Sequence, residues 1–222
     1  MGAMLCWAIW QDMNNKVWNG KSGSVKNVMA LARTNLEQWL FAQEKNFSPS
    51  SFSVGIGEGD KQWCAPHVDY YKINVDAATF SDKHRFDFGW VLRDAKGYVI
   101  QARSGSRHGC VDPGFAEALG LKEVLSWIKT SNFSNVMGET DSLVTVQALR
   151  SSVIMASPFG NCIEEYKYLL SSLNNVNFCF VKRSANRVAH AFAQDSWLYA
   201  DRSYSGSSIP SNILDVIMHE MV

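Results

Sequence analysis

The stretch YKINVDAATF, residues Tyr71–Phe80, contains one carboxylate, Asp76, in an otherwise largely apolar run of the kind found in β-strands. An ionised carboxylate in a dry interior is costly, so such a group is normally paired, hydrogen-bonded or bound to a metal. Asp76 can instead lie at a strand edge beside a bulge, but its apolar neighbours favour a buried position. We therefore expect the rest of the chain to supply a partner for this carboxylate.

The composition predicts a folded protein with a substantial core and no overall charge. The chain has 222 residues, of which 46% are hydrophobic and 8 are Trp, enough for one medium domain with appendages or two small domains. Lys and Arg number 21, as do Asp and Glu, so the net charge is zero. No overall field draws such a protein to nucleic acid or to a membrane, which disfavours tight nonspecific DNA binding but not local contacts with a few phosphates.

The cysteines and the apolar runs favour an intracellular protein. The five cysteines are scattered without a Cys-x-x-Cys pair, which favours buried reduced thiols over a disulfide framework or a zinc site. No apolar run approaches the roughly 20 residues that span a bilayer, and the opening MLCWAIW lacks the preceding positive charge of a signal peptide. We expect no membrane partner, and the nucleus and the cytoplasm both stay open.

Residues 1–45 are expected to form a helical extension. Apolar side chains recur there at steps of three and four, as on one face of a helix: Val25, Val28, Met29, Ala32, Leu36, Trp39 and Leu40. Residues 46–62 are rich in Ser, Gly and Pro and lack periodicity, so we assign them as a linker. The extension is too small to fold alone, and we expect it to dock on the main domain or on a protein partner.

Residues 63–201 have the pattern of one α/β domain. Strands are predicted within residues 70–80, 87–97, 98–107, 135–142 and 176–183. Helices are predicted over residues 113–131, 142–152, 160–174 and 184–201, with Ser142 and Ser184 as the N-caps of the second and fourth. A tight turn at Gly97 joins two strands as a hairpin, so the first three strands are antiparallel. This order predicts a mixed sheet flanked by helices, followed by a tail over residues 202–222 with a short amphipathic segment.

Three carboxylates stand where an α/β sheet places reactive groups. Asp76 lies in the first strand, Glu117 in the first turns of the first main helix, and Asp141 at the end of the fourth strand. Hard divalent cations such as Mg²⁺ prefer oxygen ligands, so two or three converging carboxylates suit them. We therefore expect a metal to neutralise Asp76.

Each of these residues has an ordinary alternative role. Glu117 by itself is a helix glutamate near the favourable end of the helix dipole, and Asp141 beside Ser142 is typical of helix capping. The specific signal is the ordered set of three. Glu139 points to the same face of its strand as Asp141, and we expect it to lie outside the ligand set or in solvent.

Five collinear motifs resemble the ribonuclease H-like domain, more narrowly the plant, reverse-transcriptase-associated form found in non-LTR retrotransposons and in stand-alone plant genes. They are YKINVDAATF, GWVLRDAKG, FAEALGLKEVL, ETDSLVTVQAL and FVKRSANRVAHAFA, within residues 63–200. The resemblance implies a ribonuclease H-like α/β fold with a five-stranded mixed sheet whose first three strands are antiparallel. It also implies an endonuclease that hydrolyses the RNA strand of RNA·DNA hybrids.

The resemblance assigns the first three catalytic carboxylates to Asp76, Glu117 and Asp141. They would hold two Mg²⁺ ions, with Asp76 bridging both, and Mn²⁺ is an alternative. The order Asp, Glu, Asp is that of ribonuclease H. Retroviral-type integrases place the glutamate last, and proofreading exonucleases have a glutamate where this chain has Ala78.

The fourth catalytic position of bacterial-type enzymes, an aspartate four residues after an asparagine, is His190 here, four residues after Asn186. A neutral imidazole suits transition metals better than Mg²⁺, so we expect weak or Mn²⁺-favoured cleavage with His190 in the catalytic set. His190 can alternatively be a half-buried residue on an amphipathic helix. The second hypothesis for function is a catalytically weak or inactive module of the same fold that binds nucleic acid or a protein partner.

A set of polar residues is expected to contact nucleic acid: Arg103, Arg107, Lys182, Arg183, Asn186 and Arg187. The charged members can equally be solvated surface groups. The 2′-hydroxyl of RNA is the group by which such a site tells RNA from DNA.

Overall fold

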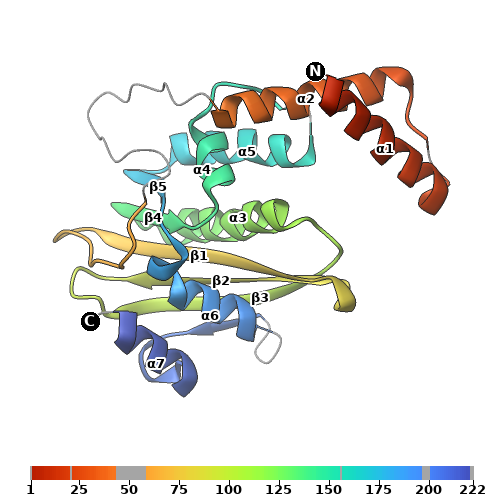
Figure 1. Cartoon of the computed structure of the whole chain (residues 1–222). Coiled ribbons are helices and arrows are strands. Elements are labelled where there is room, and N and C mark those ends of the chain that lie inside the picture. The colour runs from red at the N-terminus through yellow and green to blue at the C-terminus, as the bar shows by residue number, and fades with distance from the viewer. Residues whose placement is uncertain (1, 21, 44–58, 156, 197–200, 221–222) are drawn as a thin grey trace. The chain divides into compact units, whose positions relative to one another are not determined.

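The computed structural model describes residues 2–20, 22–43, 59–155, 157–196 and 201–220. The chain divides into two compact units, Met1–Ser53 and Val54–Val222, which are described separately (Figure 1). The first unit is a pair of helices, α1 (Gly2–Asn19) and α2 (Val25–Gln43). The N-terminal helix expected from the sequence is therefore present as α2, and the Trp-rich stretch before it forms a second helix.

The two helices of the first unit pack against each other at small side chains. Ala8 of α1 and Ala32 of α2 are completely buried. Asp12 closes the connection, because its carboxylate accepts hydrogen bonds from the Ser22 hydroxyl at 3.0 Å and from the Gly23 amide at 2.6 Å. Several large apolar side chains of the pair are exposed: Ile9, Trp10, Met13, Val17, Val25 and Met29. Across the described residues, none of the helices combines the length and the hydropathy of a membrane span.

The second unit is built on a six-stranded sheet in the order β5-β4-β1-β2-β3-β6. The strands are β1 (Tyr71–Phe80), β2 (Arg85–Arg93), β3 (Val99–His108), β4 (Val136–Thr140), β5 (Val176–Phe180) and β6 (Arg202–Tyr204). β1, β2 and β3 are antiparallel, and β4 and β5 run parallel to β1. The five predicted strands and their mixed arrangement are confirmed. β6 adds a sixth, pairing with β3 over three residues, too few to show a strand pattern in the sequence.

Helices cover both faces of this sheet (Figure 1). On one face lie α3 (Pro113–Ser131), α4 (Leu143–Arg150) and α5 (Pro158–Ser172), and on the other α6 (Arg187–Asp195) and α7 (Ser211–Glu220). The larger core lies between the sheet and α3 and α5, and includes Trp90, Leu125 and Ile163. A second core, which includes Val91, Phe192 and Ile213, lies beneath α6 and α7. The sheet is therefore buried on both faces.

The start of α6 differs from the sequence prediction. Ser184 is not its N-cap: a single turn of 3₁₀-helix spans Arg183–Ala185, and α6 begins after Asn186. The Ser184 hydroxyl donates instead to the carbonyl of Lys61 at 2.5 Å. The predicted end of this helix falls partly on residues 197–200, which lie outside the described residues.

The segments on either side of the predicted domain contribute to the second unit. Of the predicted linker, residues 59–62 are described, and the Asp60 carbonyl accepts a hydrogen bond from the Lys182 amide at 2.8 Å. The tail is more ordered than a loop with an amphipathic segment, because it forms β6 on the sheet edge and α7 against α6.

The surface differs from expectation at the cysteines. All five are free thiols, but Cys6, Cys64 and Cys110 are exposed instead of buried.

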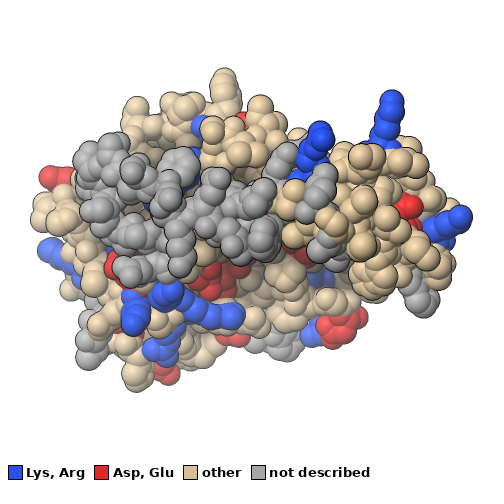
Figure 2. Space-filling view, turned by 45° about the horizontal axis from the view of Figure 1, so that its top comes forward, with Lys and Arg blue, Asp and Glu red and all other residues tan. Residues whose placement is uncertain are grey.

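Charged side chains are unevenly distributed on the surface: Figure 2 shows Lys and Arg gathered beside a patch of Asp and Glu.

The close approach of α6 to β2 gives a stability test. A Cβ placed on Gly89 would collide with the backbone of Ala193 and with Phe192 of α6. We expect Gly89→Ala to lower the free energy of unfolding by roughly 1–3 kcal/mol, because neither neighbour is a flexible side-chain end. Gly114→Ala is the control. Its Cβ would meet only Asp112 Oδ1 at 3.4 Å, in a helical turn, so no loss is expected. Urea denaturation measures the free energy of unfolding of the three proteins. An equal value for Gly89→Ala and the wild type would contradict this close packing.

Candidate active site

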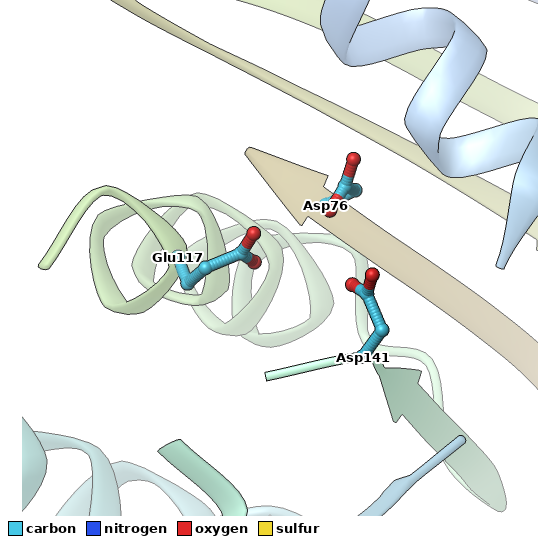
Figure 3. A group of neighbouring side chains, drawn as sticks. All are labelled: Asp76, Glu117 and Asp141. Atoms are coloured by element: carbon cyan, nitrogen blue, oxygen red, sulfur yellow. The ribbon is translucent and has the colours of Figure 1, made fainter. Parts of the chain in front are cut away.

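The three predicted carboxylates converge at the end of the central strands. Asp76 projects from β1, Glu117 from the first turns of α3, and Asp141 from the residue after β4 (Figure 3). One ligand oxygen from each lies within 4.8 Å of those of the other two. β1 and β4 are parallel neighbours with Val75 paired to Thr140, which brings the two aspartates side by side. The proximity that the sequence predicts for this set is confirmed.

The cluster has an excess of negative charge in a largely buried place. Burial raises the pKa of Glu117 to about 10, and the charges of Asp76 and Asp141 add to this effect. Burial, followed by the charge of Asp76, raises the pKa of Asp141 to about 6. The amide of Ala77 donates to Glu117 Oε1 at 3.3 Å and acts in the opposite direction. The three groups cannot all ionise cheaply without a cation between them.

The donor set fits a hard divalent cation. It consists of carboxylate oxygens from three separate elements, the ligands that Mg²⁺ and Mn²⁺ accept. Within the described part of the chain, Glu117 Oε2 is buried and has no hydrogen-bond partner. A buried acceptor without a donor is unfavourable, and a metal ion bound by these carboxylates would satisfy it.

His190 lies inside this site. Its Nδ1 is 2.6 Å from Asp76 Oδ2, so the imidazole N–H donates to the carboxylate. The guanidinium of Arg183 lies against the same ring, with Nη2 3.1 Å from Nδ1. Asp76 is almost fully buried, whereas His190 is partly exposed. The partner expected for Asp76 is therefore present as His190, and two further carboxylates lie beside it.

Asn186 fixes the position of Asp141 through a hydrogen bond. Its amide Nδ2 donates to Asp141 Oδ1 at 3.1 Å and to the Val75 carbonyl at 3.0 Å. Its Oδ1 accepts from Asn74 Nδ2 at 3.2 Å. Asn186 is completely buried. A nucleic-acid contact by Asn186 stays a prediction, but its polar atoms are used inside the protein.

Sequence reasoning missed two polar residues of β1. Lys72 pairs with Glu139 at 2.5 Å, and Asn74 donates to the other oxygen of Glu139 at 2.9 Å. Glu139 is therefore neither solvated nor among the three converging carboxylates. A signal was available, because Lys72, Asn74 and Asp76 alternate on one face of the strand.

The predicted cationic contacts fall into two groups. Near the site, Arg183 and Arg187 are exposed, and Lys182 lies over the ring of Phe180. On β3, Arg107 pairs with Asp201 at 2.7 Å and with Glu123 at 3.3 Å, and Arg103 is partly buried.

Comparison with known proteins agrees with this geometry. The family described as Reverse transcriptase-like matches residues 74–196, more than half of the chain. The chain belongs to this family. No curated protein matches it.

Solved structures show that this Reverse transcriptase-like chain has the ribonuclease H fold. RNase H1 from Halobacterium salinarum NRC-1 is similar with a TM-score of 0.53 and 20% identity, over 59% of this chain and 99% of that one. LC11-RNase H1 in complex with an RNA/DNA hybrid is similar with a TM-score of 0.50 and 16% identity, over 56% of this chain and 94% of that one. The N-terminal RNase H domain of a Mycobacterium tuberculosis protein is similar with a TM-score of 0.51 and 18% identity, over 57% of this chain and 92% of that one.

The raised pKa of Asp141 predicts how metal-free protein responds to pH. A carboxyl whose pKa is higher in the folded state stabilises the folded protein at pH values below its unfolded pKa. For Asp141 this contribution is lost as the pH rises through the folded-state pKa of about 6. We therefore expect Asp141→Asn to stabilise the metal-free protein at pH 7, by on the order of 1–2 kcal/mol, and to have little effect at pH 3.5.

Urea denaturation in EDTA at the two pH values measures this difference. The control is Asp82→Asn, which removes an exposed carboxylate that is not a member of the cluster and should leave stability unchanged at both pH values. If Asp141→Asn is destabilised at pH 7, the repulsion inferred for the cluster is wrong.

Proposed function

We propose that this protein is a metal-dependent endonuclease of the ribonuclease H type that hydrolyses the RNA strand of RNA·DNA hybrids. The observation that carries the proposal is the convergence of Asp76, Glu117 and Asp141 within 4.8 Å on a ribonuclease H fold. A structural relative, LC11-RNase H1, was solved with an RNA/DNA hybrid. The fold supplies the frame, and the carboxylates supply the chemistry.

Asp76, Glu117 and Asp141 would hold the metal ions, two Mg²⁺ or Mn²⁺. When bound, such ions activate a water as nucleophile and stabilise the leaving oxygen of an in-line displacement. The chain itself fixes where the ligands stand: Asn186 orients Asp141, the Ala77 amide orients Glu117, and His190 orients Asp76.

His190 is the fourth member of the proposed catalytic set. Its ring lies against Asp76, one of the three carboxylates that would hold the metal. A neutral nitrogen donor adds no negative charge and favours transition metals over Mg²⁺. We therefore propose that cleavage is supported better by Mn²⁺ than by Mg²⁺.

The cations beside the site would contact the phosphate backbone. Arg183 and Arg187 are the first choice, because both are exposed and Arg183 lies against His190. Lys182, Arg103 and Arg107 are the further proposed contacts, although Arg107 already pairs with two carboxylates. Because the net charge is zero, we expect modest affinity for the hybrid. The affinity should fall with salt, because the proposed contacts neutralise phosphates.

The origin and context that we propose follow from the sequence motifs. The family match supports a reverse-transcriptase-associated protein, and we propose a plant, non-LTR retrotransposon source and an intracellular location. The N-terminal helices, with exposed Trp10 and Met13, are the proposed surface for a protein partner. We propose residues 1–45 as the extension and 63–201 as the nuclease domain, to which residues 59–62, β6 and α7 are added on its flanks.

The proposal predicts cleavage of a labelled RNA·DNA hybrid by the full-length protein with Mn²⁺ or Mg²⁺. Asp76→Asn should lower the rate by roughly 100-fold or more, because one of the three proposed metal ligands loses its charge. Asp82→Asn, an exposed carboxylate outside the cluster, should cleave like the wild type. Hybrid binding without cleavage under either metal would instead favour a binding module that has lost turnover.

His190→Asp tests the role of the fourth position. A charged oxygen ligand there should raise the Mg²⁺-supported rate relative to the Mn²⁺-supported rate, by roughly tenfold. The measurement is the ratio of the two initial rates at saturating metal, with His190→Ala as the variant that removes the nitrogen without adding charge. An unchanged ratio in His190→Asp would show that His190 has no part in metal selection.

A further inference from the structure

Glu220 of α7 occupies an unfavourable position for a carboxylate. It is 4% exposed and ends its own helix, where the helix dipole favours cations. Burial adds a further penalty to an ionised group. Nothing within α7 explains why a glutamate stands there, so its partners on other elements must account for it.

The first partner of Glu220 is the beginning of α6. Glu220 Oε1 accepts hydrogen bonds from the amides of Arg187 at 2.9 Å and Val188 at 3.4 Å. The N-cap residue of α6, Asn186, makes no side-chain cap of its own. Its amide is used to hold Asp141 and Val75. Glu220 therefore supplies the cap that Asn186 cannot.

The second partner is Arg93, which is completely buried. Arg93 Nη1 is 2.7 Å from Glu220 Oε2, and Nη2 donates to Asn74 Oδ1 at 2.8 Å. The centre of the Trp63 ring lies 3.7 Å from the guanidinium carbon of Arg93. The indole N–H of Trp63 also donates to Asn74 Oδ1, at 3.0 Å. Asn74 in turn donates to Asn186. Glu220 is thus joined to Asn186 by two routes, through the backbone of α6 and through Arg93.

We propose that Glu220 is a positioning residue for the carboxylate site, which makes α7 a working part of the nuclease. It fixes the first turn of α6, from which Asn186 holds Asp141 and His190 reaches Asp76. Trp63 and Glu220 both lie outside residues 74–196, the part that the Reverse transcriptase-like family matches. The flanking segments of this chain therefore complete its site. The inference rests on the proposed function for its consequence in catalysis, but its geometry can be tested without activity.

The test is Glu220→Gln in the full-length protein. Glutamine keeps an acceptor for α6 but removes the charge that pairs with Arg93. We expect Mn²⁺ binding, measured by calorimetry, to weaken about tenfold. Hydrogen exchange without metal should become faster over residues 138–142 and over the first turn of α6. The kcat for hybrid cleavage should fall with little change in KM.

Two controls separate positioning from general loss of stability. Ile163→Ala empties part of the core on α5, away from the network, and should lower the melting temperature without changing Mn²⁺ affinity. Asp215→Asn removes an exposed charge of α7 and should change nothing.

Each outcome decides the matter. Wild-type Mn²⁺ affinity and wild-type exchange in Glu220→Gln would overturn the inference, as would an equal loss of affinity in Ile163→Ala. If the wild type binds Mn²⁺ but cleaves no hybrid, the proposed function fails while Mn²⁺ affinity still tests the positioning role. If the wild type binds no Mn²⁺, the exchange over residues 138–142 decides it alone.

Discussion

The central strand β1 places three polar side chains, Lys72, Asn74 and Asp76, on one face inside the protein, and each of them requires a partner. Lys72 is neutralised by Glu139 of the neighbouring β4. Asn74 meets four polar side chains drawn from four parts of the chain: Trp63, Arg93, Glu139 and Asn186. Asp76 is the last in this row, and it is the one that lies beside two other carboxylates, Glu117 and Asp141.

That difference separates the structural part of the row from the reactive part. Around Lys72 and Asn74 the charges are matched, since Lys72 faces Glu139 and Arg93 faces Glu220. At Asp76 one histidine pairs with the aspartate, and two further carboxylates, Glu117 and Asp141, lie close by with raised pKa values. The same strand thus stabilises the sheet at one end and leaves a site for cations at the other. The buried ion pairs Lys72–Glu139 and Arg93–Glu220 keep the carboxylates in place, whereas the carboxylates themselves repel one another.

The sequence is sufficient for five of the six strands and for the carboxylates because both follow local rules. Runs of strand-forming residues and turn signals predict five strands, and the positions of Glu117 near a helix start and Asp141 at a strand end place both near Asp76. The pairing of Arg93 with Glu220 joins residues 127 positions apart, and nothing local in either segment predicts it. Ser184 was a reasonable N-cap by residue type, but its hydroxyl found the Lys61 carbonyl instead. A capping hydrogen bond and a tertiary hydrogen bond contribute similar free energies, so residue type alone does not decide between them.

The central claim is that Asp76, Glu117 and Asp141 bind metal as one set. A crystal structure of the full-length protein grown with Mn²⁺, with anomalous diffraction collected at the manganese edge, tests it most directly. We expect an anomalous peak for a Mn²⁺ ion that is coordinated by oxygens of all three carboxylates. Ordered carboxylates without such density, at a Mn²⁺ concentration that saturates related metal enzymes, would contradict it.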